Sequence, residues 1–283
     1  MIALSAQNFL HCMDFFFLPY KSSQVACRVY GNGPRLVLAF HGYGESSERF
    51  RLLAEKGGGY TFLATDLPFH GQTSWQEGLH FTTEDLQQIM LRAVEQLNNV
   101  FTPPFSLLGY SLGGRMALRL YQSQPGLFDR LVLLAPDGLK VNGWYRLATR
   151  TWAGNRFFAF TMRHPGWFFT LLRGLNKLKL VNNSIYKFVH HAIGNVQARQ
   201  ELYQRWTALR KIKPDLSIIK KEIQARAMPV RLVYGKYDRI ILPVRGEKFR
   251  KGIEPYCHLI ILSAGHQLLR EHHAALILEQ LGD

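Results

Sequence analysis

The chain has 283 residues, of which 47% are hydrophobic and 19% charged. This composition excludes an intrinsically disordered chain and allows one large core, or a core with a smaller second domain. The three cysteines, Cys12, Cys27 and Cys257, are odd in number and widely spaced, which excludes a disulfide framework and a CxxC zinc site. We therefore expect a reducing, cytoplasmic setting.

The first twenty residues are apolar but do not have the pattern of a targeting segment. No basic residue precedes their apolar stretch, and no small-residue cleavage site follows it, so we do not expect a secretory signal. No apolar stretch in the chain approaches the roughly 20 residues that a membrane-spanning helix needs.

Short apolar segments with the character of buried strands recur along the chain, and each ends at glycine, proline or a polar residue. They are 35–40, 60–65, 105–108, 131–135, 230–234 and 258–262. Helical spacing of apolar residues is found in 47–56, 83–99, 112–124 and 267–281. This alternation predicts an α/β fold with a mostly parallel, doubly wound sheet. Because such sheets bind ligands beyond the carboxyl ends of their strands, functional residues are expected where the strands end.

The segment 139–227 breaks this alternation and carries most of the charge. It has 17 Lys and Arg against 3 Asp and Glu, whereas the whole chain has a net charge of +15. It is rich in aromatic residues and helical patterns, unlike a polar linker. We therefore predict a basic helical cap at 139–227, inserted into a core formed by 1–138 and 228–283.

A GxSxG motif at Gly109–Gly113 carries the strongest chemical signal. An apolar strand precedes Ser111 and a helical pattern follows it, which is the context that a nucleophile elbow requires. Such a turn exposes the serine hydroxyl beside the N-terminus of a helix. A glycine-rich turn with a helix-capping serine is the structural alternative. We expect Ser111 to be a catalytic nucleophile.

A serine hydroxyl needs a base, and the base needs a carboxylate to orient it. His266 follows a predicted strand and a glycine near the end of the chain. Asp238 follows the strand before it, so both side chains are expected at the same edge of the sheet. Asp137, after the strand that ends at Ala135, is a competing acid. Ser111, Asp238 and His266 are the predicted triad.

The developing negative charge on an acyl oxygen needs hydrogen-bond donors. The backbone N–H of Leu112 is one candidate, and that of Tyr43, in the loop after the strand 35–40, is the other. Tyr110 and Gly42 are predicted substrate contacts, whereas His41 is expected to have a structural role. No metal site and no cofactor are expected.

Five motifs in order resemble the α/β-hydrolase superfamily, in its serine-nucleophile, esterase- and lipase-like branch. They are His41–Gly44, Asp66–Gly71, Gly109–Gly114, Gly235–Asp238 and Gly265–His266, within about residues 24 to 282. Phe69 departs from the pattern, because many relatives have glycine there. The resemblance implies hydrolysis of a carboxylic ester or thioester through an acyl-enzyme.

Two other functions stay open. The segment Gly109–Arg115 also resembles the menaquinone-pathway lyase that eliminates pyruvate from an anionic substrate, for which Arg115 and a basic cap would be suited. A non-catalytic binding protein on the same fold is the rival class.

The expected partner is a small acyl substrate, anionic or lipid. The stretch 167–180 has the pattern of a basic amphipathic helix. Packing of that helix over the active site is the favoured interpretation, and peripheral contact with an anionic membrane is the alternative. Nucleic-acid binding is not expected, because no binding motif accompanies the charge.

Overall fold

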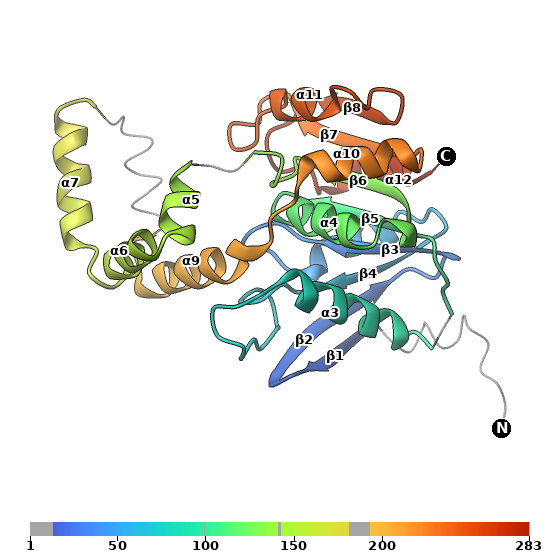
Figure 1. Cartoon of the computed structure of the whole chain (residues 1–283), viewed down its shortest axis with the longest axis horizontal. Coiled ribbons are helices and arrows are strands. Elements are labelled where there is room, and N and C mark those ends of the chain that lie inside the picture. The colour runs from blue at the N-terminus through green and yellow to red at the C-terminus, as the bar shows by residue number, and fades with distance from the viewer. Residues whose placement is uncertain (1–13, 99, 141–142, 181–192, 283) are drawn as a thin grey trace. The chain divides into compact units, whose positions relative to one another are not determined.

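The computed structural model describes residues 14–98, 100–140, 143–180 and 193–282. Eight strands form a single sheet with the order β1-β2-β4-β3-β5-β6-β7-β8 (Figure 1). β1 and β2 pair antiparallel, as do β2 and β4, and all other neighbours are parallel. The strands are β1 Phe15–Tyr20, β2 Ser23–Tyr30, β3 Arg35–Phe40, β4 Tyr60–Thr65, β5 Phe105–Tyr110, β6 Phe128–Leu134, β7 Val230–Gly235 and β8 Cys257–Leu262.

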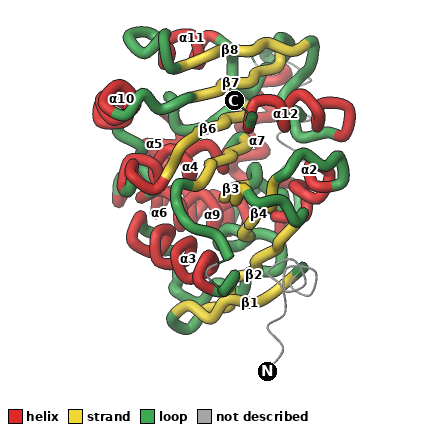
Figure 2. The backbone as a smooth tube through the Cα atoms, turned by 90° about the vertical axis from the view of Figure 1, so that its right-hand side faces the viewer, coloured by secondary structure: helices red, strands yellow, loops and turns green. Residues whose placement is uncertain are grey.

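Helices cover both faces of this sheet, as a doubly wound fold requires. α3, α4 and α10 lie on one face, and α2 and α12 lie on the other (Figure 2). Every residue of β4 and β5 is buried, which explains their continuously apolar sequences. These helices are α2 Arg51–Ala54, α3 Thr83–Glu95, α4 Leu112–Ser123, α10 Leu216–Ala225 and α12 Ala274–Leu281; α11 Val244–Arg250 packs beside β8.

The predicted α/β architecture is confirmed, and the differences have physical reasons. The two strands β1 and β2 were not predicted, because β1 is an edge strand whose phenylalanines Phe15 and Phe17 are exposed. The helix predicted at 267–281 begins later, since a loop after His266 and a short turn at Glu271–His273 precede α12. α11, which follows Pro243, was also missed.

The chain divides into two compact units. The first comprises Met1–Glu77, Phe81–Lys140 and Lys211–Asp283, and the second comprises Gly78–His80 and Val141–Arg210. The predicted insert extended further, to 227. The second unit is shorter because α10 buries Ile219 and Ile223 and packs against α4, within the first unit.

The described part of the second unit is helical. It contains α5 Gly143–Arg150, α6 Trp152–Arg163, α7 Gly166–Lys177 and α9 Val196–Ala208. α5 and α6 pack together, and α6 also packs on α9, where Phe158 meets Tyr203 and Trp206. None of the helices that the structure describes combines the length and apolarity needed to cross a membrane.

Candidate active site

Ser111 lies at the turn between β5 and α4, in the conformation of a nucleophile elbow. Its φ of 50° and ψ of −113° fall in a region that residues with side chains rarely adopt. The turn is tight: a Cβ atom on Gly113 would lie 1.9 Å from the carbonyl oxygen of Phe40, on the neighbouring strand β3. The glycine of the motif therefore lets α4 begin directly against the sheet, with Ser111 at its N-terminus.

His266 and Asp238 lie beside Ser111. The Nε2 atom of His266 is 3.0 Å from Ser111 Oγ, and its Nδ1 atom is 2.7 Å from Asp238 Oδ2. The Asp238 side chain is fully buried, and its other oxygen accepts hydrogen bonds from the backbone N–H groups of Ile240 and Ile241. These two donors compensate the buried carboxylate and fix its orientation toward the imidazole.

The competing acid Asp137 has different partners. Its carboxylate pairs with the Arg115 guanidinium and accepts the Gly138 N–H, and its own N–H donates to Ser111 O at 2.8 Å. Asp137 therefore supports the turn that carries Ser111. Arg115 is buried on α4 in this ion pair, so it supports the same turn.

The predicted oxyanion donors come from two adjacent loops. β3 and β5 are parallel neighbours, with Phe40 opposite Gly109, so the loop with Tyr43 and the turn with Leu112 emerge at the same edge of the sheet. Leu112 is the first residue of α4, and the first N–H groups of a helix have no acceptor within it. The assignment of these two N–H groups as oxyanion donors stays a prediction.

The two predicted substrate contacts, Tyr110 and Gly42, lie next to each other, and Tyr110 contacts the histidine. Tyr110 is buried, its ring centroid is 5.7 Å from that of His266, and its hydroxyl donates to His266 O at 3.2 Å. A Cβ atom on Gly42 would lie 3.0 Å from the Tyr110 ring. Tyr110 therefore packs against His266, and the lack of a side chain at Gly42 leaves room for the Tyr110 ring. Contact of either residue with substrate stays a prediction.

His41 has the structural role expected for it. Its ring is fully buried, Nδ1 lies 2.8 Å from Gly42 O, and Nε2 accepts the Leu67 N–H at 3.0 Å. It ties the loop after β3 to the loop after β4. Phe69 in that second loop has a φ of 63°, a left-handed conformation that favours glycine.

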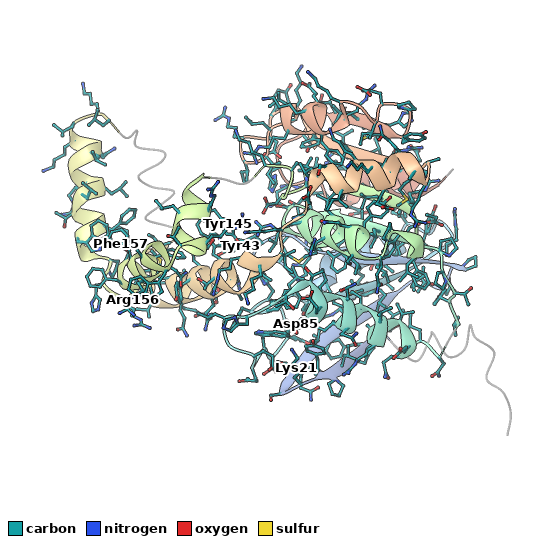
Figure 3. All side chains as sticks on the ribbon, in the orientation of Figure 1. Lys21, Tyr43, Asp85, Tyr145, Arg156 and Phe157 are labelled. Atoms are coloured by element: carbon teal, nitrogen blue, oxygen red, sulfur yellow. The ribbon has the colours of Figure 1, made fainter. Side chains whose placement is uncertain are left out.

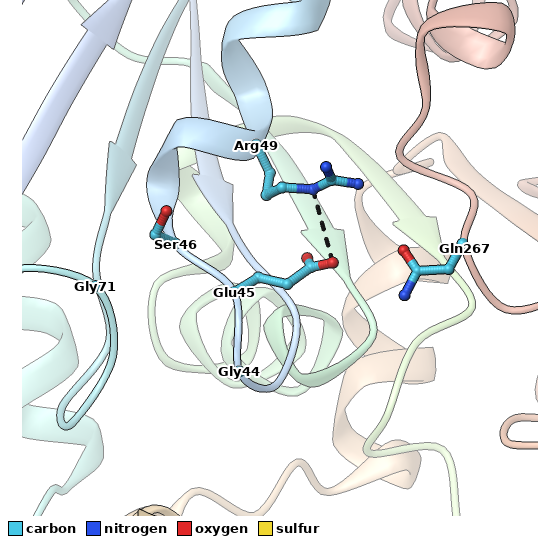
Figure 4. Close-up of a pocket in the computed structure, with 6 residues that line it drawn as sticks. All are labelled: Gly44, Glu45, Ser46, Arg49, Gly71 and Gln267. Carbon is cyan, nitrogen blue, oxygen red and sulfur yellow. Dashed lines mark ion pairs between the residues drawn. The ribbon is translucent and has the colours of Figure 1, made fainter.

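A shallow, open cavity that is lined in part by Gln267, the residue after His266, was not predicted from the sequence. It has a volume of about 400 Å³ and is lined by Gly44, Glu45, Ser46, Arg49, Gly71 and Gln267 (Figure 4). Glu45 Oε1 lies 3.7 Å from Arg49 Nε. Burial raises the pKa of the Glu45 carboxyl, while Arg49 opposes this effect. The signal in the sequence was the four-residue spacing of Glu45 and Arg49, just after the His41–Gly44 motif.

The described residues give no indication of a metal centre. Among them, no group of three or more His, Cys, Asp and Glu side chains is arranged to hold a metal ion. Cys27 and Cys257 are free and buried, and burial raises the pKa of the Cys257 thiol to about 12.

The sheet, its helices and the serine elbow together define an enzyme of the α/β-hydrolase kind. The profile of the α/β hydrolase fold family matches residues 35–272, and the chain belongs to that family. It is 22% identical to the uncharacterized hydrolase YugF of Bacillus subtilis, over 89% of this chain and 90% of that protein.

Two further similarities extend over most of the chain. It is 25% identical to the pimeloyl-[acyl-carrier protein] methyl ester esterase of Aeromonas salmonicida, over 77% of this chain and 82% of that protein. The structure of a thermophilic esterase from Thermogutta terrifontis has the same fold, with a TM-score of 0.67, 16% identity and coverage of 94% and 97%.

Proposed function

We propose that this enzyme hydrolyses a carboxylic ester or thioester through an acyl-enzyme on Ser111. The observation that carries the proposal is the chain of two contacts, Ser111 Oγ to His266 Nε2 at 3.0 Å and His266 Nδ1 to Asp238 Oδ2 at 2.7 Å. A hydroxyl, an imidazole and a carboxylate in this order form an activated nucleophile. The similarity to a methyl ester esterase supports an ester as the substrate class.

In the proposed first half-reaction, Ser111 Oγ attacks the acyl carbon while its proton passes to His266 Nε2. The acyl oxygen becomes an oxyanion, which the N–H groups of Leu112 and Tyr43 would stabilise. The bond to the alcohol or thiol then breaks, and the leaving group takes the proton from Nε2. Asp238 keeps its charge, holds the proton on Nδ1 and stabilises the imidazolium.

In the second half-reaction, His266 Nε2 removes a proton from water, whose oxygen attacks the acyl-enzyme. The acyl–Oγ bond breaks, Ser111 recovers its proton and the carboxylic acid leaves. This sequence needs no metal and no redox cofactor, because every proton moves between the substrate, water and His266.

In the alternative function, a lyase acting on an anionic substrate, the cationic side chain of Arg115 would bind that substrate. No observation favours it, because that guanidinium is buried and paired with Asp137. The same contact has a simpler interpretation, namely that Arg115 holds the loop after β6 against α4.

The test is labelling with a fluorophosphonate probe, which reacts with activated serines, followed by mass spectrometry of the labelled peptide. Wild type should be labelled at Ser111, and Ser111→Ala should not. Ser123→Ala is the matched control, because this serine lies at the end of α4 and its hydroxyl donates to Leu120 O; it should label like wild type. p-Nitrophenyl esters of two to twelve carbons would give the acyl-length preference. Folded wild type that neither labels nor turns over any ester would overturn the proposal.

A further inference from the structure

An exposed apolar and basic surface lies on α6 and α7 of the second unit. Its apolar side chains are exposed to solvent, with Trp152 at 77% and Leu178 at 70%. The others are Phe157, Phe160, Trp167, Leu171 and Leu180. The two helices meet where the rings of Phe157, labelled in Figure 3, and Trp167 lie 5.2 Å apart. These exposed side chains are termed here the α6–α7 surface.

α7 presents two apolar faces, of which only one is covered. Leu172 is its single buried residue. Trp167, Leu171 and Leu178 are exposed, and their spacing of four and seven residues puts them in one stripe along the helix. The side of α7 with Leu172 is buried, whereas the stripe with Leu171 is exposed, although apolar stripes of this length are normally buried.

The charge around this stripe has one sign. Between residues 143 and 180 there are seven Lys and Arg and no Asp or Glu. Arg173 and Lys177 are exposed and, being four residues apart, share one face of α7, on which Lys177 is the nearer to the stripe. On α6, Arg156, labelled in Figure 3, has its guanidinium carbon 5.1 Å from the centroid of the exposed Trp152 ring. Apolar side chains bordered by cations are the pattern of a helix that lies in a lipid–water interface.

We propose that the α6–α7 surface docks the enzyme on an anionic lipid bilayer, with its aromatic and leucine side chains among the headgroups. A bilayer with anionic lipids provides both an apolar phase and negative charge. A second copy of the chain would bring two uniformly basic surfaces together and repel. An acidic protein would also satisfy the cations, and the experiments below distinguish it from a bilayer.

Flotation with lipid vesicles tests the docking, using the full chain. Wild type should bind vesicles of phosphatidylcholine with 30% phosphatidylglycerol and bind vesicles of pure phosphatidylcholine far more weakly. Raising salt from about 0.1 to 0.5 M should weaken the binding, because the Debye length shortens. Arg173→Gln with Lys177→Gln should lower the partition coefficient about thirtyfold, as expected for two cations near a charged membrane. Lys248→Gln with Lys251→Gln, on the first unit, removes the same charge elsewhere and should change it less than threefold.

Apolar variants separate this proposal from general attraction by a basic chain. Trp152→Ser with Phe157→Ser should reduce binding at least tenfold, and Tyr237→Ser with Ile240→Ser, equally exposed on the first unit, should not. Circular dichroism would verify that each variant is folded.

Equal binding by the α6–α7 variants and their controls would overturn the proposal. So would a dimer in light scattering that Trp152→Ser with Phe157→Ser dissociates, since the partner would then be a second copy. Absence of binding to both vesicles, with retention on immobilised polyglutamate, would point to an acidic protein and also overturn it.

Discussion

His266 Nδ1 lies 2.7 Å from Oδ2 of Asp238, and the opposite oxygen of that carboxylate accepts two backbone N–H groups. Each oxygen of the carboxylate therefore has its own partners. Oδ1 is bound by the backbone of the loop after β7, and Oδ2 faces the imidazole. These hydrogen bonds restrain rotation of the carboxylate and keep Oδ2 directed at the histidine, although Asp238 lies in a loop.

Asp238→Asn is the first prediction. An amide keeps the shape of the side chain but cannot accept the Nδ1 proton with a full charge, so kcat for p-nitrophenyl esters should fall by about 10⁴. The KM should change little, because Asp238 is buried away from substrate.

Asp137→Asn is the matched control for that change. It alters a carboxylate near Ser111 that pairs with Arg115 rather than with the histidine. Its kcat should stay within about tenfold of wild type. If the two variants exchanged these effects, Asp137 would be the acid of the triad and our assignment would be wrong.

The sequence was most informative where chemistry imposes a spacing. The strands at 35–40 and 60–65 were predicted with the limits that β3 and β4 have, because buried parallel strands are continuously apolar and end abruptly. The three residues Ser111, Asp238 and His266 follow three parallel strands, β5, β7 and β8, and parallel strands bring their carboxyl ends to one edge. Their proximity could therefore be predicted without any knowledge of side-chain positions.

The sequence was less informative where position depends on contacts distant along the chain. Glu45 and Gln267 line one cavity, yet they are far apart in sequence and neither belongs to a recognised motif. The end of the predicted insert at 227 differs from the end of the second unit at Arg210 for the same reason, since α10 buries Ile219 and Ile223 and packs against α4 in the first unit. Helical periodicity cannot tell which neighbour a helix packs against.

Gly113→Ala is the second prediction. A methyl group there would lie 1.9 Å from the carbonyl oxygen of Phe40, which belongs to a central strand. The clash can be relieved only if α4 moves away from β3, so the free energy of unfolding should fall by about 3 kcal/mol or more. Labelling of Ser111 should be lost in parallel, since the elbow would be displaced.

Gly174→Ala is its control, because nothing lies within 4 Å of the added methyl group on α7. Alanine in a helix interior should stabilise that unit by about 0.5–1 kcal/mol. Thermal and urea unfolding would measure both variants. Equal effects from the two would show that backbone crowding is not the reason for glycine at 113.

Glu45→Gln tests the cavity through pH. Burial raises the pKa of the Glu45 carboxyl in the folded protein above its value in the unfolded chain. Its favourable contribution to stability is therefore fully present below the unfolded pKa and is lost as pH rises through the folded pKa. The glutamine variant does not ionise and lacks this loss. Its free energy of unfolding should therefore increase relative to that of wild type as pH rises from about 4 to 7.

Arg49→Gln should act in the opposite direction, because Arg49 lowers the pKa of Glu45. Without this cation the pKa of Glu45 is higher still, so the Arg49→Gln variant should lose more stability than wild type as pH rises. The difference in free energy of unfolding between the two proteins should widen toward pH 7. Urea titrations at each pH would give the free energies. A difference between Glu45→Gln and wild type that does not vary with pH would show that the carboxyl is not perturbed by burial.

Arg115→Met tests whether the guanidinium supports the turn or meets a substrate. Methionine fills a similar volume but leaves the Asp137 carboxylate without its cation, so the free energy of unfolding should fall by about 1–3 kcal/mol. Adding Asp137→Asn should recover much of that loss, because the double variant buries no unpaired charge. Ester turnover per folded molecule should stay within about tenfold of wild type. If stability were unchanged while KM rose only for esters of dicarboxylic acids, Arg115 would bind an anionic substrate, and its pairing with Asp137 would be incidental.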